Sequence, residues 1–145
     1  MDLEPPQDGP ARLYAATFIF AAGAFDEDFH QLDARIAEAA RSLPGYLGEE
    51  SWENAAQGLV SNVYYWATLD DLQALMRHPA HLAAKAAQSR WLRGYQVVVA
   101  EVLAGYGDGR LADQLPAAHR RMPPPTRLAL GQATPPVPGQ SDPIV

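Results

Sequence analysis

Asn62 and Trp66 are the two side chains whose types and spacing most strongly suggest a chemical site. They lie in the segment Leu59–Trp66 (LVSNVYYW), which is rich in residues that favour β-strands. Side chains alternate between the two faces of a strand, so Asn62 and Trp66 share one face with Tyr64. An amide on an otherwise apolar strand needs a partner, because a buried unpaired amide is costly. A core tryptophan beside an asparagine satisfied by the backbone is the structural alternative.

A second pair of chemically capable residues is His78 and His81. Their spacing of three can place two imidazoles on one helix face. No third ligand such as Asp or Glu is evident nearby, so we predict no metal site. His78 precedes Pro79, which interrupts a helix, and this favours a structural role at a helix end. Acid–base chemistry or contact with a substrate is the open alternative for both histidines.

Composition narrows the classes of function. The 145 residues suffice for one domain with a proper core, and the net charge of −6 argues against a nucleic-acid partner. The chain has no cysteine, which excludes disulfides and thiolate chemistry. Residues 1–6 (MDLEPP) lack the basic and apolar regions of a signal peptide, and no apolar run has the length of a membrane span. We therefore expect a cytoplasmic protein without a membrane segment.

The spacing of hydrophobic residues, together with Gly and Pro residues that end helices and strands, divides the chain into expected strands and helices. Asp26 is a plausible helix N-cap, and Pro44-Gly45 stops the helix that follows it. Gly94 is a natural end for a later helix. The expected strands are 12–20, 46–53, 59–66 and 95–103, and the expected helices are 27–43, 69–77 and 80–93.

Three regions of different composition follow from this division. Residues 1–11 form an irregular lead-in, residues 12–106 form the domain, and residues 107–145 form a Pro-rich extension. The extension holds eight of the thirteen prolines and only a weak helical signal at 111–121. It is expected to be a solvated tail or an arm that packs on a partner subunit.

The element order βαββαβ predicts an α+β fold with one antiparallel sheet and helices on a single face. The last strand is apolar on both faces, with Val97 and Val99 on one side and Val98 on the other. A strand of this kind is expected to be buried on both sides. One chain lacks the elements for a second layer, so we predict that a second copy provides it and that the protein is a homodimer.

The order of these features is similar to that of a known family. A strand at Leu59–Trp66, the step His78-Pro79-Ala80-His81, Trp91 and a Val-rich strand at Tyr95–Val102 together resemble the antibiotic-biosynthesis monooxygenase-like group of the dimeric α/β-barrel superfamily. The resemblance covers about residues 12–105. It implies a ferredoxin-like unit whose sheet pairs with that of a second subunit to form a barrel.

The resemblance also implies a reaction. Members that oxygenate aromatic polyketides without a cofactor carry an Asn-x-x-x-Trp pattern on this strand, which Asn62 and Trp66 match. There the two donors hold a substrate oxygen and stabilise the enolate-like anion that reacts with dioxygen. This chain departs from the pattern in three places, with Leu72 in place of a tyrosine, Lys85 in place of an arginine and Trp52 in place of a histidine.

The expected function is therefore cofactor-independent oxygenation of a small planar aromatic or polyketide-like substrate. Its predicted catalytic residues are Asn62, Trp66, His81 and Lys85, and its predicted substrate-binding residues are Trp52, Tyr64, Leu72 and His78.

Two other functions remain open. The superfamily also contains haem-degrading enzymes, but Lys85 and Leu75 occupy the positions of their axial histidine and their tryptophan. His81 lies one turn from the ligand position, so haem is not expected. The last alternative is a dimeric module that binds a small ligand without catalysis.

Overall fold

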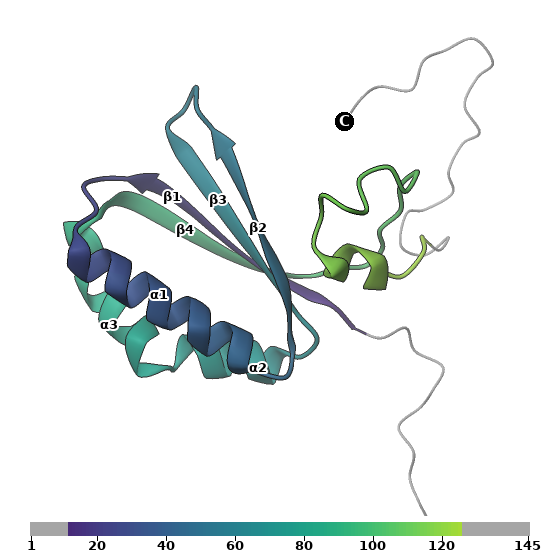
Figure 1. The fold of residues 1–145 in the computed structure, drawn as a ribbon, viewed down its shortest axis with the longest axis horizontal. Helices are drawn as coiled ribbons and strands as arrows, with labels where there is room; N and C mark the ends of the chain where they lie inside the picture. Colours follow the sequence, from purple (N-terminus) through teal and green to yellow (C-terminus); the bar gives the residue numbers. More distant parts are fainter. Residues whose placement is uncertain (1–11, 126–145) are drawn as a thin grey trace, which may run out of the picture.

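The computed structural model describes residues 12–125, which form a four-stranded antiparallel sheet with helices packed on it (Figure 1). The sheet order is β2-β3-β1-β4. The strands are β1 (Tyr14–Ala22), β2 (Tyr46–Asn54), β3 (Leu59–Trp66) and β4 (Leu92–Glu101). The helices are α1 (Glu27–Ser42), α2 (Leu69–Met76), α3 (Pro79–Ala87) and the short 3₁₀ turns η1 (Gln88–Arg90) and η2 (Ala117–Arg121).

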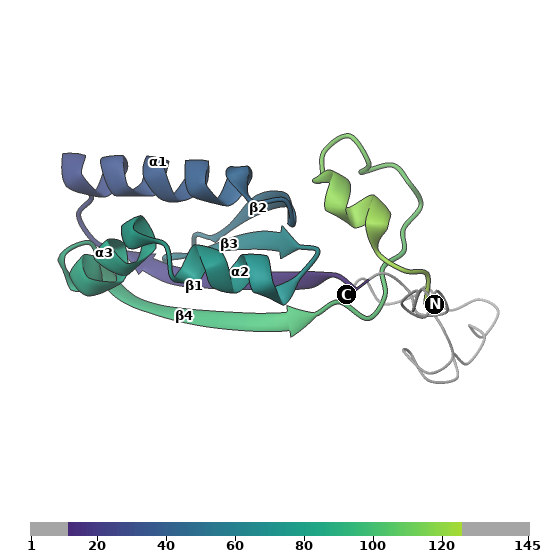
Figure 2. The ribbon, with the colours of Figure 1, turned by 90° about the horizontal axis from the view of Figure 1, so that it is seen from below.

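All three α-helices lie on one face of the sheet (Figure 2), which we call the helix face. The opposite face is called the outer face. The connection βαββαβ and this strand order are those of a ferredoxin-like fold, so the predicted fold class is confirmed. None of the helices within residues 12–125 is long and apolar enough to cross a membrane.

The start of α1 is set by Asp26, as the sequence predicts. Its carboxylate accepts a hydrogen bond from the backbone N–H of Phe29 (2.9 Å) and thereby caps the helix. The same oxygen accepts the indole N–H of Trp91 (2.8 Å), and Arg90 contacts the second oxygen at 3.1 Å. One side chain therefore ties the first turn of α1 to the entry of β4.

The predicted helix 80–93 ends earlier than expected. Regular helix stops at Ala87, and β4 already begins at Leu92, so Gly94 lies inside a strand rather than at a helix end. Pairing with β1 explains the difference, because Leu92 is the register partner of Ala22 and the N–H of Gly23 donates to the carbonyl of Trp91 (2.7 Å). Tertiary strand pairing has overridden the local helical pattern here.

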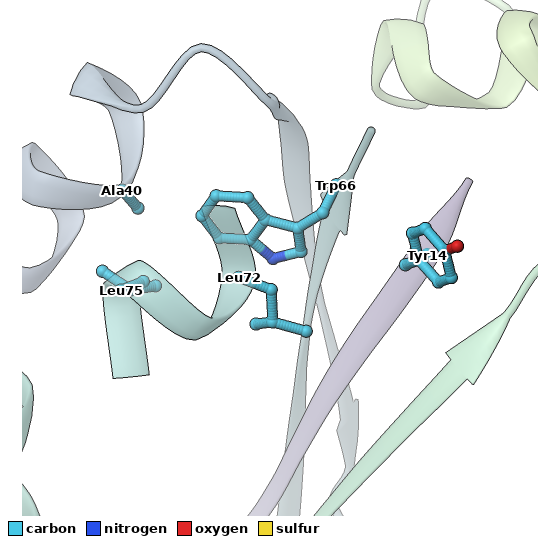
Figure 3. Close-up of a cluster of buried hydrophobic side chains, with 5 residues drawn as sticks. All are labelled: Tyr14, Ala40, Trp66, Leu72 and Leu75. Carbon is cyan, nitrogen blue, oxygen red and sulfur yellow. The ribbon is translucent and has the colours of Figure 1, made fainter. Parts of the chain in front are cut away.

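The main core lies between the helix face and the helices, and Trp66 is at its centre (Figure 3). The Trp66 side chain is fully buried, and Leu72, Leu75 and Ala40 from the helices pack around it together with Tyr14 from β1. Trp66 is therefore a core residue, as the structural alternative in the sequence analysis expected. Trp66 also carries a polar atom that this core does not satisfy, as described below.

A smaller second core covers one end of the outer face. It is formed by residues 103–125, which we call the strap, folding back over Leu13 and Tyr65. Ala118 of η2 is completely buried there. The strap is closed on itself by a hydrogen bond from the N–H of Gly105 to the carbonyl of Pro123 (2.9 Å).

The strap corrects the expectation for part of the extension. Within residues 107–125, Ala118 and Met122 pack on the sheet of their own chain, so this part of the extension is not a solvated tail. The weak helical signal at 111–121 corresponds only to a short 3₁₀ turn, η2. The predicted lead-in 1–11 and the rest of the extension lie outside the described residues.

Glu50 on the outer face fastens the strap to the sheet. Its carboxylate accepts hydrogen bonds from the phenol of Tyr65, from His119 Nε2 of the strap (2.7 Å) and from the indole of Trp52 (2.8 Å). Burial alone would raise the pKa of Glu50, but these three donors hold it below its ordinary value. The carboxylate therefore stays ionised at neutral pH and is fully occupied.

Replacement of Glu50 by glutamine should loosen the strap. A carboxamide cannot accept from all three donors, and a donor left unpaired costs about 1–3 kcal/mol. We expect trypsin to cleave after Arg120 and Arg121 of the variant at least tenfold faster, as measured by mass spectrometry over time. Glu53→Gln on the same strand is the control and should cleave at the wild-type rate. Equal cleavage of the Glu50 variant and wild type would show that this carboxylate does not hold the strap.

Strand β4 is exposed on both faces in the described part of the chain. Val97 and Val99 on the helix face are 44% and 46% exposed, and Val98 on the outer face is 46% exposed. The expected burial of this strand is thus not provided by its own chain. Its apolar side chains form an open edge region that a further layer would cover.

Candidate functional site

A cavity of about 450 Å³ lies between the helix face and the helices. This volume falls in the range of pockets that hold small molecules. Its lining is mainly apolar and aromatic, with contributions from β1, β3, β4 and all three α-helices. The cavity opens beside β4, where Tyr95, Val97 and Val99 line it and remain exposed.

Six of the predicted site residues line this one cavity. Asn62, Tyr64 and Trp66 reach it from β3, because they share the helix face of that strand. The others come from α2 and α3 and are Leu72, His81 and Lys85. The structure therefore brings all four predicted catalytic residues together.

The Asn62 amide is paired on one side only. The Ser51 hydroxyl, from the opposite position on β2, donates to Asn62 Oδ1 (2.7 Å). The amide is therefore satisfied by a side chain and not by the backbone. Its nitrogen has no hydrogen-bond partner within residues 12–125, so Asn62 presents a free N–H₂ donor.

The indole N–H of Trp66 is a second donor without an acceptor. The nitrogen is fully buried and has no hydrogen-bond partner in the described part of the chain. Figure 3 shows Leu72 below the indole, on the side of its nitrogen, with Leu75 and Ala40 beyond its six-membered ring. A buried donor left unpaired is costly, and a ligand oxygen would remove that cost once the side chains that cover the nitrogen give access to it.

His81 adds a neutral imidazole to the same lining. Burial lowers its pKa, the positive charges of Lys85 and His78 lower it further, and the carbonyl of Met76 acts in the opposite direction. Its Nδ1 atom is buried without a partner among the described residues. The imidazole is uncharged at neutral pH and can accept a proton from a group in the cavity.

The lowered pKa of His81 predicts a specific pH dependence of stability. The unfolded chain binds this proton at pH values where the folded chain does not, so the free energy of unfolding falls as the pH drops below about 6.5. The carboxylates with lowered pKa values act only at more acidic pH. We expect His81→Leu to flatten the decline in melting temperature between about pH 7 and 5.5. The exposed His30→Leu should retain the wild-type decline, and an unchanged slope in His81→Leu would contradict the assignment.

Two predicted substrate-binding residues lie elsewhere. Trp52 pairs with Ser61 and therefore projects from the outer face, where it is 56% exposed and lines an open groove beside the strap. His78 caps α3, since its Nδ1 accepts the N–H of Ala80 (3.1 Å). Neither Trp52 nor His78 lines the cavity, and the contact that the structure gives the His78 side chain is the helix cap.

Comparison with known proteins identifies a relative of this chain. No protein-family model matches it. The protein YqjZ of Bacillus subtilis strain 168, described as uncharacterized, is 33% identical over 100 residues, which are 68% of this chain and 82% of YqjZ. The chain belongs to the YqjZ family.

Solved structures share the fold of this YqjZ-family chain. A conserved protein from Methanosarcina mazei Go1 has a TM-score of 0.52 at 10% identity, over 63% of this chain and 93% of its own. SnoaB from Streptomyces nogalater, a cofactor-independent oxygenase, aligns over 68% of this chain and 97% of its own, with a TM-score of 0.49 at 13% identity. The ferredoxin-like fold that the resemblance implies is confirmed by the strand order of the sheet. At 10–13% sequence identity, these structures give no information on the reaction of the YqjZ-family chain.

Asp33 of α1 is a lining residue that the sequence analysis missed. Its side chain is part of the cavity lining. Partial burial raises the pKa of the Asp33 carboxyl, and the negative charge of Glu49 raises it further, although the residue as a whole is exposed. The sequence did contain a pattern that points to this residue, because Asp33 lies four residues after Phe29 and three before Ile36, on the same side of the helix. It is thus a carboxylate on the apolar stripe of its helix in this YqjZ-family chain.

Tyr64 is a lining residue but not a base. Burial and the nearby Glu49 carboxylate raise the pKa of its phenol well above the ordinary value. Glu49 in turn is paired with Arg41 of α1 at 2.8 Å. Tyr64 therefore stays protonated and serves the cavity as a wall and a neutral polar group. Within residues 12–125 no group of three or more His, Asp or Glu side chains is arranged to hold a metal ion.

Proposed function

We propose that this chain is a monooxygenase that acts without a cofactor on a small planar aromatic or polyketide-like substrate. The observation that carries the proposal is the pair of free donors on β3. The Trp66 indole N–H is buried without an acceptor, the Asn62 N–H₂ group bonds to none of the described residues, and both side chains line one largely apolar cavity. Donors fixed in a dry site stabilise an oxygen that becomes negatively charged during a reaction.

The remaining lining residues suit the proton transfer that such a reaction needs. A neutral His81 accepts a proton from the substrate, which becomes an enolate or phenolate held by the β3 donors. Lys85 at the exposed end of the cavity contributes positive charge. The resulting carbanion passes an electron to dioxygen, and recombination of the two radicals forms a peroxide on the same carbon. Loss of the second hydrogen of that carbon as a proton breaks the O–O bond, so that one oxygen stays as a carbonyl and the other leaves with both protons as water. The substrate CH₂ group supplies all the electrons.

Oxygen uptake with anthrone- or quinol-like substrates tests this function. The purified protein is expected to consume one dioxygen per substrate oxidised in the presence of EDTA and without added flavin or metal. The product is identified by mass spectrometry after reaction under ¹⁸O₂. Consumption no faster than in buffer with every such substrate would contradict the oxygenase proposal. Saturable binding of those same compounds would then favour a ligand-binding module.

A second copy of the chain is the partner that the surface supports best. Beyond the part that the strap covers, the outer face carries Ile19 and Val98 without a covering layer from residues 12–125. The exposed β4 side chains continue this apolar surface to the sheet edge. Pairing of two outer faces would bury both and would give the barrel expected for a homodimer.

One observation favours a haem-binding or haem-degrading relative as a second candidate. His81 lines the cavity as a neutral imidazole whose buried Nδ1 has no partner among the described residues, and a neutral imidazole is the form that ligates iron. Lys85, however, stands where the resemblance places the axial histidine. We therefore expect no marked Soret shift when haem is titrated into the protein. A stoichiometric complex with a histidine-ligated spectrum that is lost in His81→Ala would reverse the order of the two candidates.

A further inference from the structure

Trp91 lies at one end of the cavity, and Trp66 lies at the other. Trp66 is paired with Tyr14, at the start of β1. Leu92, which directly follows Trp91, is paired with Ala22 at the end of the same strand. Both indoles line the cavity and both are almost completely buried. The cavity therefore has a tryptophan at each end, and its exposed opening lies between them beside β4.

Asn62 lies midway between these two ends. Its partner on β1 is Phe18, which is four residues from Tyr14 and four residues from Ala22. At about 3.3 Å per residue, each end of β1 is roughly 13 Å from the Asn62 position, and the side chains at the ends take up part of that length. A substrate that Asn62 holds by one oxygen therefore has a limited length available on either side.

The part of the cavity between Asn62 and Trp91 is lined by aromatic rings, and we call it the aromatic half. Phe18 and Phe20 of β1 stack with 5.1 Å between ring centres, and Tyr95 of β4 lies 5.7 Å from Phe18. The opposite half is packed with side chains of the main core. Flat rings pack well against aromatic faces and edges, so a planar substrate would lie in the half that ends at Trp91.

Trp91 is fixed in place by both its side chain and its backbone. Its indole N–H donates to Asp26 Oδ1 (2.8 Å), and the direction of this bond is certain because an indole only donates and an ionised carboxylate only accepts. The ring packs edge-on against Phe29 with 5.6 Å between ring centres, and the Arg90 guanidinium lies over it at 5.0 Å. The Trp91 carbonyl accepts the N–H of Gly23 (2.7 Å), and a Cβ atom on that glycine would lie 2.6 Å from the carbonyl oxygen. The indole therefore forms a rigid wall, which is what discrimination by substrate length requires.

We propose that Trp91 is a specificity-determining residue, which closes the aromatic half of the cavity and limits the length of the planar ring system that Asn62 can hold. This inference rests on the proposed function, in which Asn62 donates to an oxygen of an aromatic substrate. A rigid wall rejects a substrate that is one ring too long, because the extra ring overlaps the indole or draws the substrate oxygen away from Asn62. The protein is thus a selector for short fused-ring systems.

Three coloured quinones that share one dihydroxyquinone head and differ in the number of linearly fused rings test this limit. They are naphthazarin with two rings, quinizarin with three, and dihydroxynaphthacenequinone with four. Wild type is expected to bind the four-ring compound roughly 10-fold to 100-fold more weakly than quinizarin in absorbance titrations. Trp91→Phe should reduce that ratio to about threefold, and Trp91→Ala should abolish it. Phe25→Leu is the matched control and should keep the wild-type ratio, because Phe25 packs on Phe29 at the same end but does not line the cavity.

The binding ratio does not depend on turnover, so the length limit and the oxygenase function fail separately. A Trp91→Phe variant that melts early yet keeps the wild-type ratio would show that Trp91 is only a core residue, and would overturn the proposal. Equal affinity of wild type for all three quinones, or binding of none of them, would overturn it as well. If wild type consumes no oxygen with anthrone but rejects the four-ring compound, and Trp91→Phe relaxes that rejection, the oxygenase function fails while the length limit stands.

Discussion

An Asn62→Ala variant should lose on the order of 100-fold in kcat for oxygen uptake while melting within a few degrees of wild type. The loss in rate corresponds to removing one preorganised donor from the developing oxyanion. The small effect on stability follows from the partner, since Ser51 is exposed and its hydroxyl can bond to water after the amide is gone. Oxygen uptake and differential scanning calorimetry on the same preparations measure both quantities.

The adjacent Ser61→Ala provides the matched control for that substitution. Ser61 lies on the same strand but faces outward, opposite Trp52, so its loss should leave both rate and melting temperature near the wild-type values. A variant of Asn62 that melts several degrees early yet retains full activity would show that the amide is a structural bracket. In that case the donor pair would no longer support the proposed reaction.

The second large effect is expected in the oligomeric state. Wild type should be a dimer at micromolar concentration, with an interface of about 1,600 Å² or more. Val98→Glu places a charge on the outer face of β4, and burial of an unpaired charge is prohibitive, so this variant should be a monomer. Multi-angle light scattering gives the mass directly.

Val97→Glu is the matched control for Val98. The two valines are neighbours on β4 with nearly equal exposure, 44% and 46%, but they project from opposite faces. The Val97 variant should remain dimeric if the outer faces pair. Dissociation by both variants would place the interface at the β4 edge, and a monomeric wild type would rule out the barrel.

The parts of the fold that follow local chemistry could be predicted from the sequence. The strand Leu59–Trp66 has the predicted bounds, because Gly58 precedes it and Thr68 caps the helix that follows. The start of α1 at Asp26 is likewise a local hydrogen bond. The helix face of β3 and the grouping of Asn62, Tyr64 and Trp66 required only the alternation of side chains along a strand.

The parts that were missed depend on contacts between distant segments. The side on which Trp52 projects is set by the register of β2 against β3 and by the irregular pairing at Tyr46 and Gly48, neither of which local periodicity reports. The strap escaped prediction because it is held by a buried alanine and a carboxylate on another element rather than by an apolar stripe. Residues near Arg93 were misassigned because pairing with β1 outweighs their helical pattern.

The position of β1 in the sheet has a consequence for synthesis of the protein. Among the four strands of the sheet this one is translated first, yet it lies in the interior of the sheet and pairs with β3 on one side and β4 on the other. Its pairing is completed only when Leu92–Glu101 has left the ribosome, and the apolar end of its outer face is covered only when Ala118 follows. Contacts of such long range are formed late and slowly. The nascent chain therefore carries an open apolar strand from the emergence of β1 until that of β4, which is the interval in which we expect it to depend on chaperones.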